Sequence, residues 1–156
     1  FDELYPGLFR YCHRLTGEAD VADDVAQEAF VRLYDRRIVG TEEGVRAWLF
    51  RTATHLVRDH YRVEANRRRL LEANPVRPEG IESPDRRVER TEDVARVRGV
   101  LETLGERDRE MLLMREEGFS YREIAVTVDV AYGSVGTLLA RAERRFVGAY
   151  EHAEDN

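Results

Sequence analysis

Apolar residues recur at intervals of three and four along most of this chain, and no other feature of the sequence constrains its fold as strongly. Such spacing lines one face of an α-helix, whereas a β-strand alternates with a period of two. Neither a sustained alternation nor an Asn-Gly hairpin turn occurs. The sequence therefore predicts an all-α fold, with helices over residues 3–15, 20–37, 42–70, 88–104, 107–117, 120–128 and 133–150.

A longer break in the helical pattern occupies residues 72–87, which contain Pro75, Pro78 and Pro84. Proline lacks an amide proton and fixes φ, so a helix cannot continue through this stretch. We interpret it as a flexible linker. The predicted architecture is two small helical domains, residues 1–71 and 88–156, of which the second ends in a helix-turn-helix.

The overall composition excludes several classes of protein. A single cysteine, Cys12, excludes a disulfide within the chain and a multi-cysteine zinc site. No apolar run approaches the roughly 20 residues that span a bilayer, and no signal peptide opens the chain. We therefore expect a cytoplasmic protein with no membrane insertion, cofactor or bound metal.

Charge is distributed unevenly along the chain, whose formal net charge is −6. Residues 46–69 carry seven arginines and two acidic residues, a local charge of +5, whereas residues 1–45 and 101–156 each carry −5. Local charge decides whether a phosphate backbone is attracted. The sequence thus predicts that one basic segment of an acidic protein contacts nucleic acid.

Within the predicted helix 42–70, cationic side chains line one face. They fall at i, i+4, i+7 and i+11, namely Arg51, His55, Arg58 and Arg62, which we call the basic stripe, and Arg67, Arg68 and Arg69 follow. A row of cations along a helix suits a phosphate backbone. Tyr61 and Trp48 could stack on unpaired bases, although Trp48 fits a core position equally well. The buried face is predicted to hold Val45, Trp48, Leu49, Thr52, Ala53, Leu56, His60 and Val63.

The predicted helix 20–37, with Asp20 as a candidate N-cap, has an apolar face and an acidic face. The apolar face holds Ala22, Val25, Ala26, Ala29, Phe30 and Leu33, and the other holds Asp24, Gln27, Glu28, Val31 and Asp35. The acidic face has three interpretations: a solvated surface, a protein-docking surface, or a Mg²⁺ site built on Asp20, Asp24 and Glu28. The metal site would need a second acidic helix, and none is evident.

The last two predicted helices have the pattern of a helix-turn-helix. Ser120 and Glu123 form a capping box at the start of the first. A short turn over residues 129–132 follows, and the final helix buries Val135, Leu138, Leu139, Ala142 and Phe146. Its outward face, with Thr137, Arg141 and Arg144, is suited to the major groove of DNA.

Three motifs follow one another along the chain. Residues 23–30 read DDVAQEAF, residues 48–53 and 59–62 read WLFRTA and DHYR, and residues 101–125 include RDRE at 107–110 and GFSYREIA at 118–125. Together they resemble bacterial sigma factors of the extracytoplasmic-function group, over nearly the whole chain. The resemblance implies a transcription initiation factor, not an enzyme, that directs core RNA polymerase to promoter DNA and is commonly held by an anti-sigma partner.

The resemblance also implies a role for each motif. Polymerase would bind Asp24, Gln27, Glu28, Phe30 and Val31. The loop 38–44 and the side chains of Trp48, Arg51, His55, Arg58, Arg62, Arg67, Arg68 and Arg69 would hold the melted −10 element. The −35 element would contact Arg122, Ser134, Thr137, Arg141 and Arg144. The family usually has asparagine at His55 and cations at Gly136 and Leu138, so we expect phosphate contacts and DNA shape to carry more of the −35 recognition.

Two other functions account for parts of the sequence. A stand-alone helix-turn-helix regulator explains residues 101–150 but leaves the acidic helix and the basic stripe unused. A metal-dependent nucleotide hydrolase built on Asp20, Asp24 and Glu28 has no convergent nucleophile, base or phosphate loop to support it.

Overall fold

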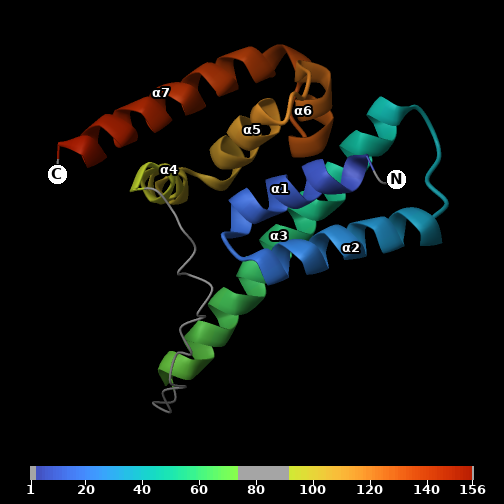
Figure 1. Cartoon of the computed structure of the whole chain (residues 1–156), viewed down its shortest axis with the longest axis horizontal. Helices are drawn as coiled ribbons and strands as arrows, with labels where there is room; N and C mark the ends of the chain where they lie inside the picture. The colour runs from blue at the N-terminus through green and yellow to red at the C-terminus, as the bar shows by residue number, and fades with distance from the viewer. Residues whose placement is uncertain (1–2, 74–91, 156) are drawn as a thin grey trace.

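The computed structural model describes residues 3–73 and 92–155, in which every regular element is helical and no strand occurs. The elements, drawn in Figure 1, are α1 (Leu4–Thr16), α2 (Ala19–Asp35), α3 (Glu42–Ala73), α4 (Glu92–Thr103), α5 (Glu106–Glu116), α6 (Tyr121–Val128), a 3₁₀ turn η2 (Tyr132–Ser134) and α7 (Val135–Glu154). The predicted all-α fold is confirmed. The predicted linker 72–87 lies outside the described residues except for its first two positions, which continue α3, and so does the predicted helix start at residue 88.

Local signals in the sequence set most of the helix ends. Gly17 ends α1 with a left-handed φ of 71°, a conformation that glycine adopts without a Cβ clash. The amide of Gly44 donates to the Thr41 hydroxyl at 3.1 Å, which caps α3. The capping box of Ser120 and Glu123 is also present at the start of α6. The predicted cap at Asp20 is wrong, because α2 begins one residue earlier and Asp20 lies in its first turn.

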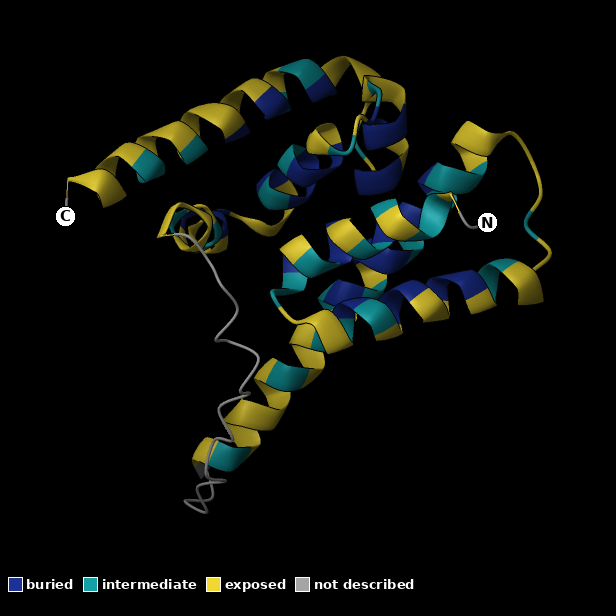
Figure 2. Cartoon of the chain, viewed as in Figure 1, coloured by how far each residue is buried: buried dark blue, intermediate teal, exposed yellow. Residues whose placement is uncertain are grey.

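Helices α1, α2 and the first half of α3 form the first domain, with the predicted apolar face of α2 turned inward. Leu33 is partly buried, and the other five predicted residues of that face, Ala22, Val25, Ala26, Ala29 and Phe30, are buried. They pack with side chains such as Leu8, Tyr11 and Leu49 from the neighbouring helices. The second half of α3 projects away from this packing and is mostly exposed (Figure 2).

The predicted buried face of α3 is partly wrong. Val63 is 64% exposed, because it lies in the projecting half. Phe50, Thr54 and Val57, which the prediction left out, are buried. The reason is that α3 packs against α1 and α2 and also against α6, so its buried surface is wider than a single stripe. Buried Thr54 shares a 2.7 Å hydrogen bond with the Tyr11 hydroxyl.

Helices α4 to α7 form the second domain, in which α7 packs against α4, α5 and α6. Its buried residues include Met111, Met114, Ile124, Val135 and Leu139. None of the described helices is long and apolar enough by itself to cross a bilayer. Only α6 and α7 together, with a bend of 109° between them, reach that length and composition.

The two domains share one continuous apolar core in this structure. Phe50 of α3 and Phe119, which precedes α6, are both buried, and their ring centroids lie 4.5 Å apart. Helix α1 contacts α5, and α3 contacts α6. The chain therefore adopts a closed arrangement in which the second domain covers one side of the first.

We predict that Cys12 does not react with thiol reagents while the protein is folded. Cys12 is fully buried, and burial raises the pKa of its thiol to about 12, so almost no reactive thiolate exists at pH 8. A chromogenic disulfide reagent should detect the thiol only after guanidinium unfolding. Rapid stoichiometric labelling of the native protein would contradict this packing.

Candidate nucleic-acid interface

The basic stripe lies on one uninterrupted helix, α3, which begins in the first domain's core and ends in the projecting segment. His55 and Arg62 are exposed, and Arg62 lies 3.6 Å from Asp59 on its own helix. Arg67 is also exposed, 3.9 Å from Glu64. Arg68 and Arg69 are exposed, and neither forms an ion pair with a residue that the structure describes. These side chains present a cationic ridge to solvent.

The other two arginines of the basic stripe contact carboxylates of the second domain. Arg58 donates to Glu110 of α5 from Nε at 2.9 Å and from Nη2 at 2.5 Å, and Glu106 lies 3.7 Å away. Burial raises the pKa of Glu110, and the hydrogen bonds from Arg58 counter only part of that shift. Arg51 lies 3.0 Å from Asp129, the residue that ends α6. No pattern in the sequence indicated these long-range pairs.

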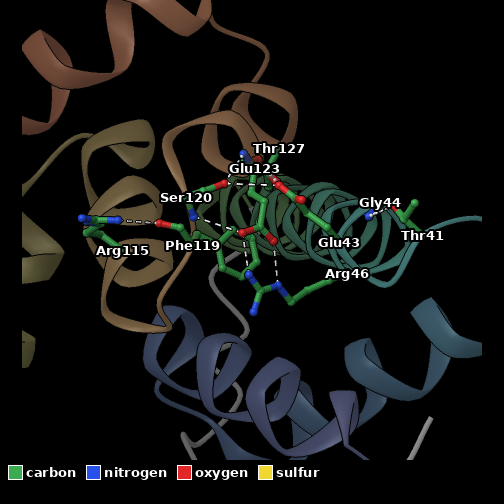
Figure 3. Close-up of polar contacts among 9 residues, drawn as sticks. All are labelled: Thr41, Glu43, Gly44, Arg46, Arg115, Phe119, Ser120, Glu123 and Thr127. Atoms are coloured by element: carbon green, nitrogen blue, oxygen red, sulfur yellow. Dashed lines mark hydrogen bonds and ion pairs between the residues drawn. The ribbon is translucent and has the colours of Figure 1, made fainter.

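Arg46, the first cation of the basic segment, makes a contact of the same kind with a buried carboxylate (Figure 3). It donates to both oxygens of buried Glu123, at 2.7 and 2.5 Å, and its guanidinium stands 4.7 Å above the ring of Phe119. Glu123 also accepts the backbone N–H of Ser120. Burial alone would raise the pKa of Glu123, but the hydrogen bonds from Arg46 and the Ser120 amide overcome it and hold the pKa below its usual value.

Helix α1 adds further contacts of the same kind. Arg10 and Arg14 lie 3.1 and 3.4 Å from Glu117, which follows α5. In the opposite direction, Arg98 of α4 donates to the backbone carbonyls of His13 and Gly17 at the C-terminal end of α1. Cations are favoured at that end because the free carbonyls carry partial negative charge.

Two aromatic side chains that were expected near the −10 strand have protein partners. Trp48 is partly buried and packs against the core, which favours the structural interpretation of this residue. Tyr61 is 37% exposed, and its hydroxyl donates to the carbonyls of Leu15 and Thr16. The loop 38–44 remains largely exposed, with Val39 at 89%.

The expected polymerase-docking residues of α2 lie on one exposed face, with one exception. Asp24, Gln27, Glu28 and Val31 are exposed. Phe30 is the exception: it is 4% exposed and its ring lies 5.9 Å from that of Tyr5, so it packs in the core, in agreement with its place on the predicted apolar face of α2. Tyr34, which the sequence analysis did not name, is 64% exposed and lies one turn after Val31 on α2.

The acidic residues of α2 do not form a metal site. Among residues 3–73 and 92–155, no three His, Cys, Asp or Glu side chains are grouped in a way that could hold a metal ion. Gln27 donates to Asp23 at 2.8 Å, and Arg32 donates to Glu28 at 3.1 Å. Asp20, Asp24 and Glu28 therefore share a helix face but not a coordination geometry.

The residues expected to contact the −35 element lie on the open side of the second domain. They are all exposed: Arg122, Ser134, Thr137, Arg141 and Arg144. Ser134 ends the 3₁₀ turn η2, which the sequence analysis did not predict, and α7 begins at the next residue. The start of α7 passes close to α6, because a Cβ atom added at Gly136 would lie 3.6 Å from the ring of Tyr121.

The fold and these surfaces define a class of protein: an all-helical DNA-binding factor with a basic helix in one domain and a helix-turn-helix in the other. Two family models match it in order. Residues 1–67 match Sigma-70 region 2, and residues 95–146 match Sigma-70, region 4.

Similar proteins support the same assignment. The RNA polymerase sigma-H factor of Pseudomonas aeruginosa is 32% identical, in an alignment covering 86% of this chain and 79% of that protein. The ferric citrate uptake sigma factor FecI of Escherichia coli is 31% identical over 78% of this chain and 71% of its own length. The ECF RNA polymerase sigma factor SigL of Mycobacterium tuberculosis is 41% identical over 40% of this chain.

A solved structure has the same fold. The sigma factor RpoE of Bartonella quintana, in complex with the anti-sigma factor NepR, superposes with a TM-score of 0.65, covering 95% of this chain and 92% of that one at 20% identity. The chain belongs to the extracytoplasmic-function group of sigma-70 factors. It is a promoter-directing factor of RNA polymerase.

We predict that Arg46→Ala destabilises the protein by about 2 kcal/mol, because it leaves buried Glu123 without its bidentate partner. Urea unfolding would measure the loss. The matched control is Arg32→Ala, which removes an exposed i,i+4 pair with Glu28 and should cost only about 0.3 kcal/mol.

The Arg46 effect should also depend on pH. The pKa of Glu123 is lowered in the folded protein, so the pair stabilises the fold above the ordinary glutamate pKa and loses this effect as the pH falls through the lowered value. The difference between wild type and Arg46→Ala should therefore shrink in acid. Equal costs for the two variants at neutral pH would refute the role of the pair.

Proposed function

We propose that this sigma factor uses three separate surfaces to start transcription: α2 to dock on core RNA polymerase, the basic stripe and the end of α3 to hold the melted −10 strand, and the start of α7 to contact the −35 element. The observation that carries the proposal is the order of the two Sigma-70 matches, regions 2 and 4, on a chain whose acidic and basic helices expose these surfaces. It acts as a binding module and not as an enzyme, in the cytoplasm where polymerase and promoters are found.

The same proposal includes the domain limits expected from the sequence, residues 1–71 and 88–156 with a linker at 72–87. It also includes an anti-sigma partner, which is supported by the complex of RpoE with NepR. A stand-alone helix-turn-helix regulator is not favoured, because residues 1–67 match a sigma region that such a protein does not need.

A reconstituted transcription assay tests the function. Core polymerase and this chain should together produce transcripts from a subset of genomic promoters, and neither component alone should do so. Binding of a palindromic duplex by the free chain, with no effect of added polymerase, would instead favour the regulator.

We predict that Asp24→Arg weakens association with core polymerase by about tenfold, because it reverses a charge on the exposed face of α2. Titration of labelled chain with core polymerase would measure the change. The control is Asp155→Arg, which makes the same charge change at the far end of α7. Equal affinities of the two variants for core polymerase would indicate that the exposed face of α2 is a solvated surface and not a docking surface.

We predict that the double variant Arg62→Ala, Arg67→Ala slows promoter opening but leaves polymerase association unchanged. Both side chains are exposed, and each has only a nearby acid on its own helix as a partner. The affinity for single-stranded DNA falls with salt, and loss of two phosphate contacts should make the negative slope of log affinity against log salt shallower by about 1.4. Permanganate footprinting measures opening, with Arg32→Ala as the control, and a normal footprint in the double variant would rule out this role of α3.

A further inference from the structure

A short chain of hydrogen bonds links α1 to the exposed face of α2. The Tyr5 hydroxyl of α1 donates to Oδ1 of Asp23, and the side-chain amide of Gln27 donates to Oδ2 of the same carboxylate at 2.8 Å. Tyr5 and Asp23 are partly buried, whereas Gln27 is exposed. The chain of bonds therefore runs from the edge of the core to the surface, and it ends on one of the residues expected to dock on polymerase.

Two aromatic neighbours hold the ring of Tyr5 in place. Its centroid lies 6.4 Å from that of Phe9, one turn later on α1, and 5.9 Å from that of buried Phe30 on α2. A tyrosine in such a position has its apolar body against the core and its hydroxyl near water. Because the ring is packed, the hydroxyl has a fixed place from which to bind Asp23.

The Tyr5 hydroxyl keeps its proton at any physiological pH. Burial, together with the hydrogen bond to Asp23 and the negative charge of that carboxylate, raises the pKa of Tyr5 to about 12, and the nearby Gln27 amide offsets only part of this rise. The hydroxyl is therefore a permanent donor. Both oxygens of Asp23 act as acceptors, one for Tyr5 and one for Gln27.

This arrangement determines which end of the Gln27 amide faces outward. A glutamine side chain has a donor end, Nε2, and an acceptor end, Oε1, whereas an ionised carboxylate only accepts. Nε2 must therefore face Asp23, which makes Oε1 the end available to a partner. Asp24 and Glu28, exposed on the same helix face, also offer only oxygen acceptors. The face of α2 is thus suited to a partner surface that carries hydrogen-bond donors.

The bond to Asp23 also reduces the cost of binding. A free glutamine side chain populates several rotamers, and fixing it in an interface costs conformational entropy. Gln27 is already held through Asp23, and Asp23 is held by Tyr5. The acceptor is therefore in place before a partner arrives.

We propose that Tyr5 is a positioning residue for polymerase docking: through Asp23 it holds the Gln27 amide with its oxygen toward core polymerase. Neither Tyr5 nor Asp23 was among the expected docking residues. The proposal rests on the proposed function, because it takes the exposed face of α2 as the docking surface.

The test compares the full chain with its Tyr5→Phe variant. This change keeps the ring and its packing against Phe9 and Phe30 and removes only the hydroxyl. The matched control is Tyr11→Phe, the same change on the same helix, because the Tyr11 hydroxyl bonds Thr54 of α3 at 2.7 Å instead of Asp23. Urea unfolding establishes that both variants are folded under the conditions of the assays.

The first readout is the mobility of the Gln27 amide. Gln27 is the only glutamine of the chain, so an isotope label on the glutamine amide nitrogen marks a single side chain for NMR relaxation. We expect the order parameter of Nε2 to fall below about 0.6, the range of flexible groups, in Tyr5→Phe and to keep its wild-type value in Tyr11→Phe. An unchanged amide in Tyr5→Phe would overturn the proposal.

The second readout is the affinity for core polymerase, measured by titration of labelled chain. We expect Tyr5→Phe to weaken association about fivefold and Tyr11→Phe to leave it unchanged. In a Gln27→Ala background, Tyr5→Phe should have no further effect, because the group that it positions is absent. An equal loss in Tyr5→Phe and Tyr11→Phe, or an undiminished effect of Tyr5→Phe without Gln27, would overturn the positioning role.

The two readouts separate this inference from the proposed function, because the NMR measurement contains no polymerase. If Asp24→Arg and Gln27→Ala both leave the affinity for core polymerase unchanged, α2 is not the docking surface, and the proposed function fails together with the positioning role. If those two variants weaken association but Tyr5→Phe does not, docking through α2 stands and positioning by Tyr5 is refuted.

Discussion

Arginine–carboxylate pairs around a small aromatic contact hold the two domains of this chain together. Phe50 and Phe119 supply the apolar centre, and Arg46 covers Phe119 while it binds Glu123. Glu123 is also the residue that completes the capping box of α6. One carboxylate thus stabilises the start of the helix-turn-helix and joins it to the other domain, so local folding and domain arrangement depend on the same group.

Helix α3 has to satisfy three demands at once. Its first half packs against α1 and α2, a second face of that half meets α6, and its exposed end carries cations into solvent. A helix that buries a single face shows a simple amphipathic pattern in its sequence. With two packed faces the apolar positions spread around the helix, which explains why Thr54 and Val57 are buried beside the basic stripe.

The structure explains the uneven distribution of charge along the sequence. The basic helix α3 is not surrounded by solvent alone. Acidic side chains of the second domain, among them Glu110, Glu123 and Asp129, form ion pairs with its arginines. Carboxylates and phosphates compete for the same guanidinium donors. The net charge of −6 therefore does not describe the surface of α3, because several of the acids that lower the net charge are paired with its arginines.

The sequence by itself determined the helices, their caps at Gly17, Thr41 and Ser120, the two-domain character and the family, because these depend on residues close together in the chain and on ordered motifs. It also placed the basic stripe on one helix, since the helical period alone fixes that alignment. Only the tertiary structure decided that Arg51 and Arg58 have carboxylate partners in the second domain. Those facts depend on which surfaces meet across more than 50 residues of chain, and helical periodicity carries no information about contacts at that range.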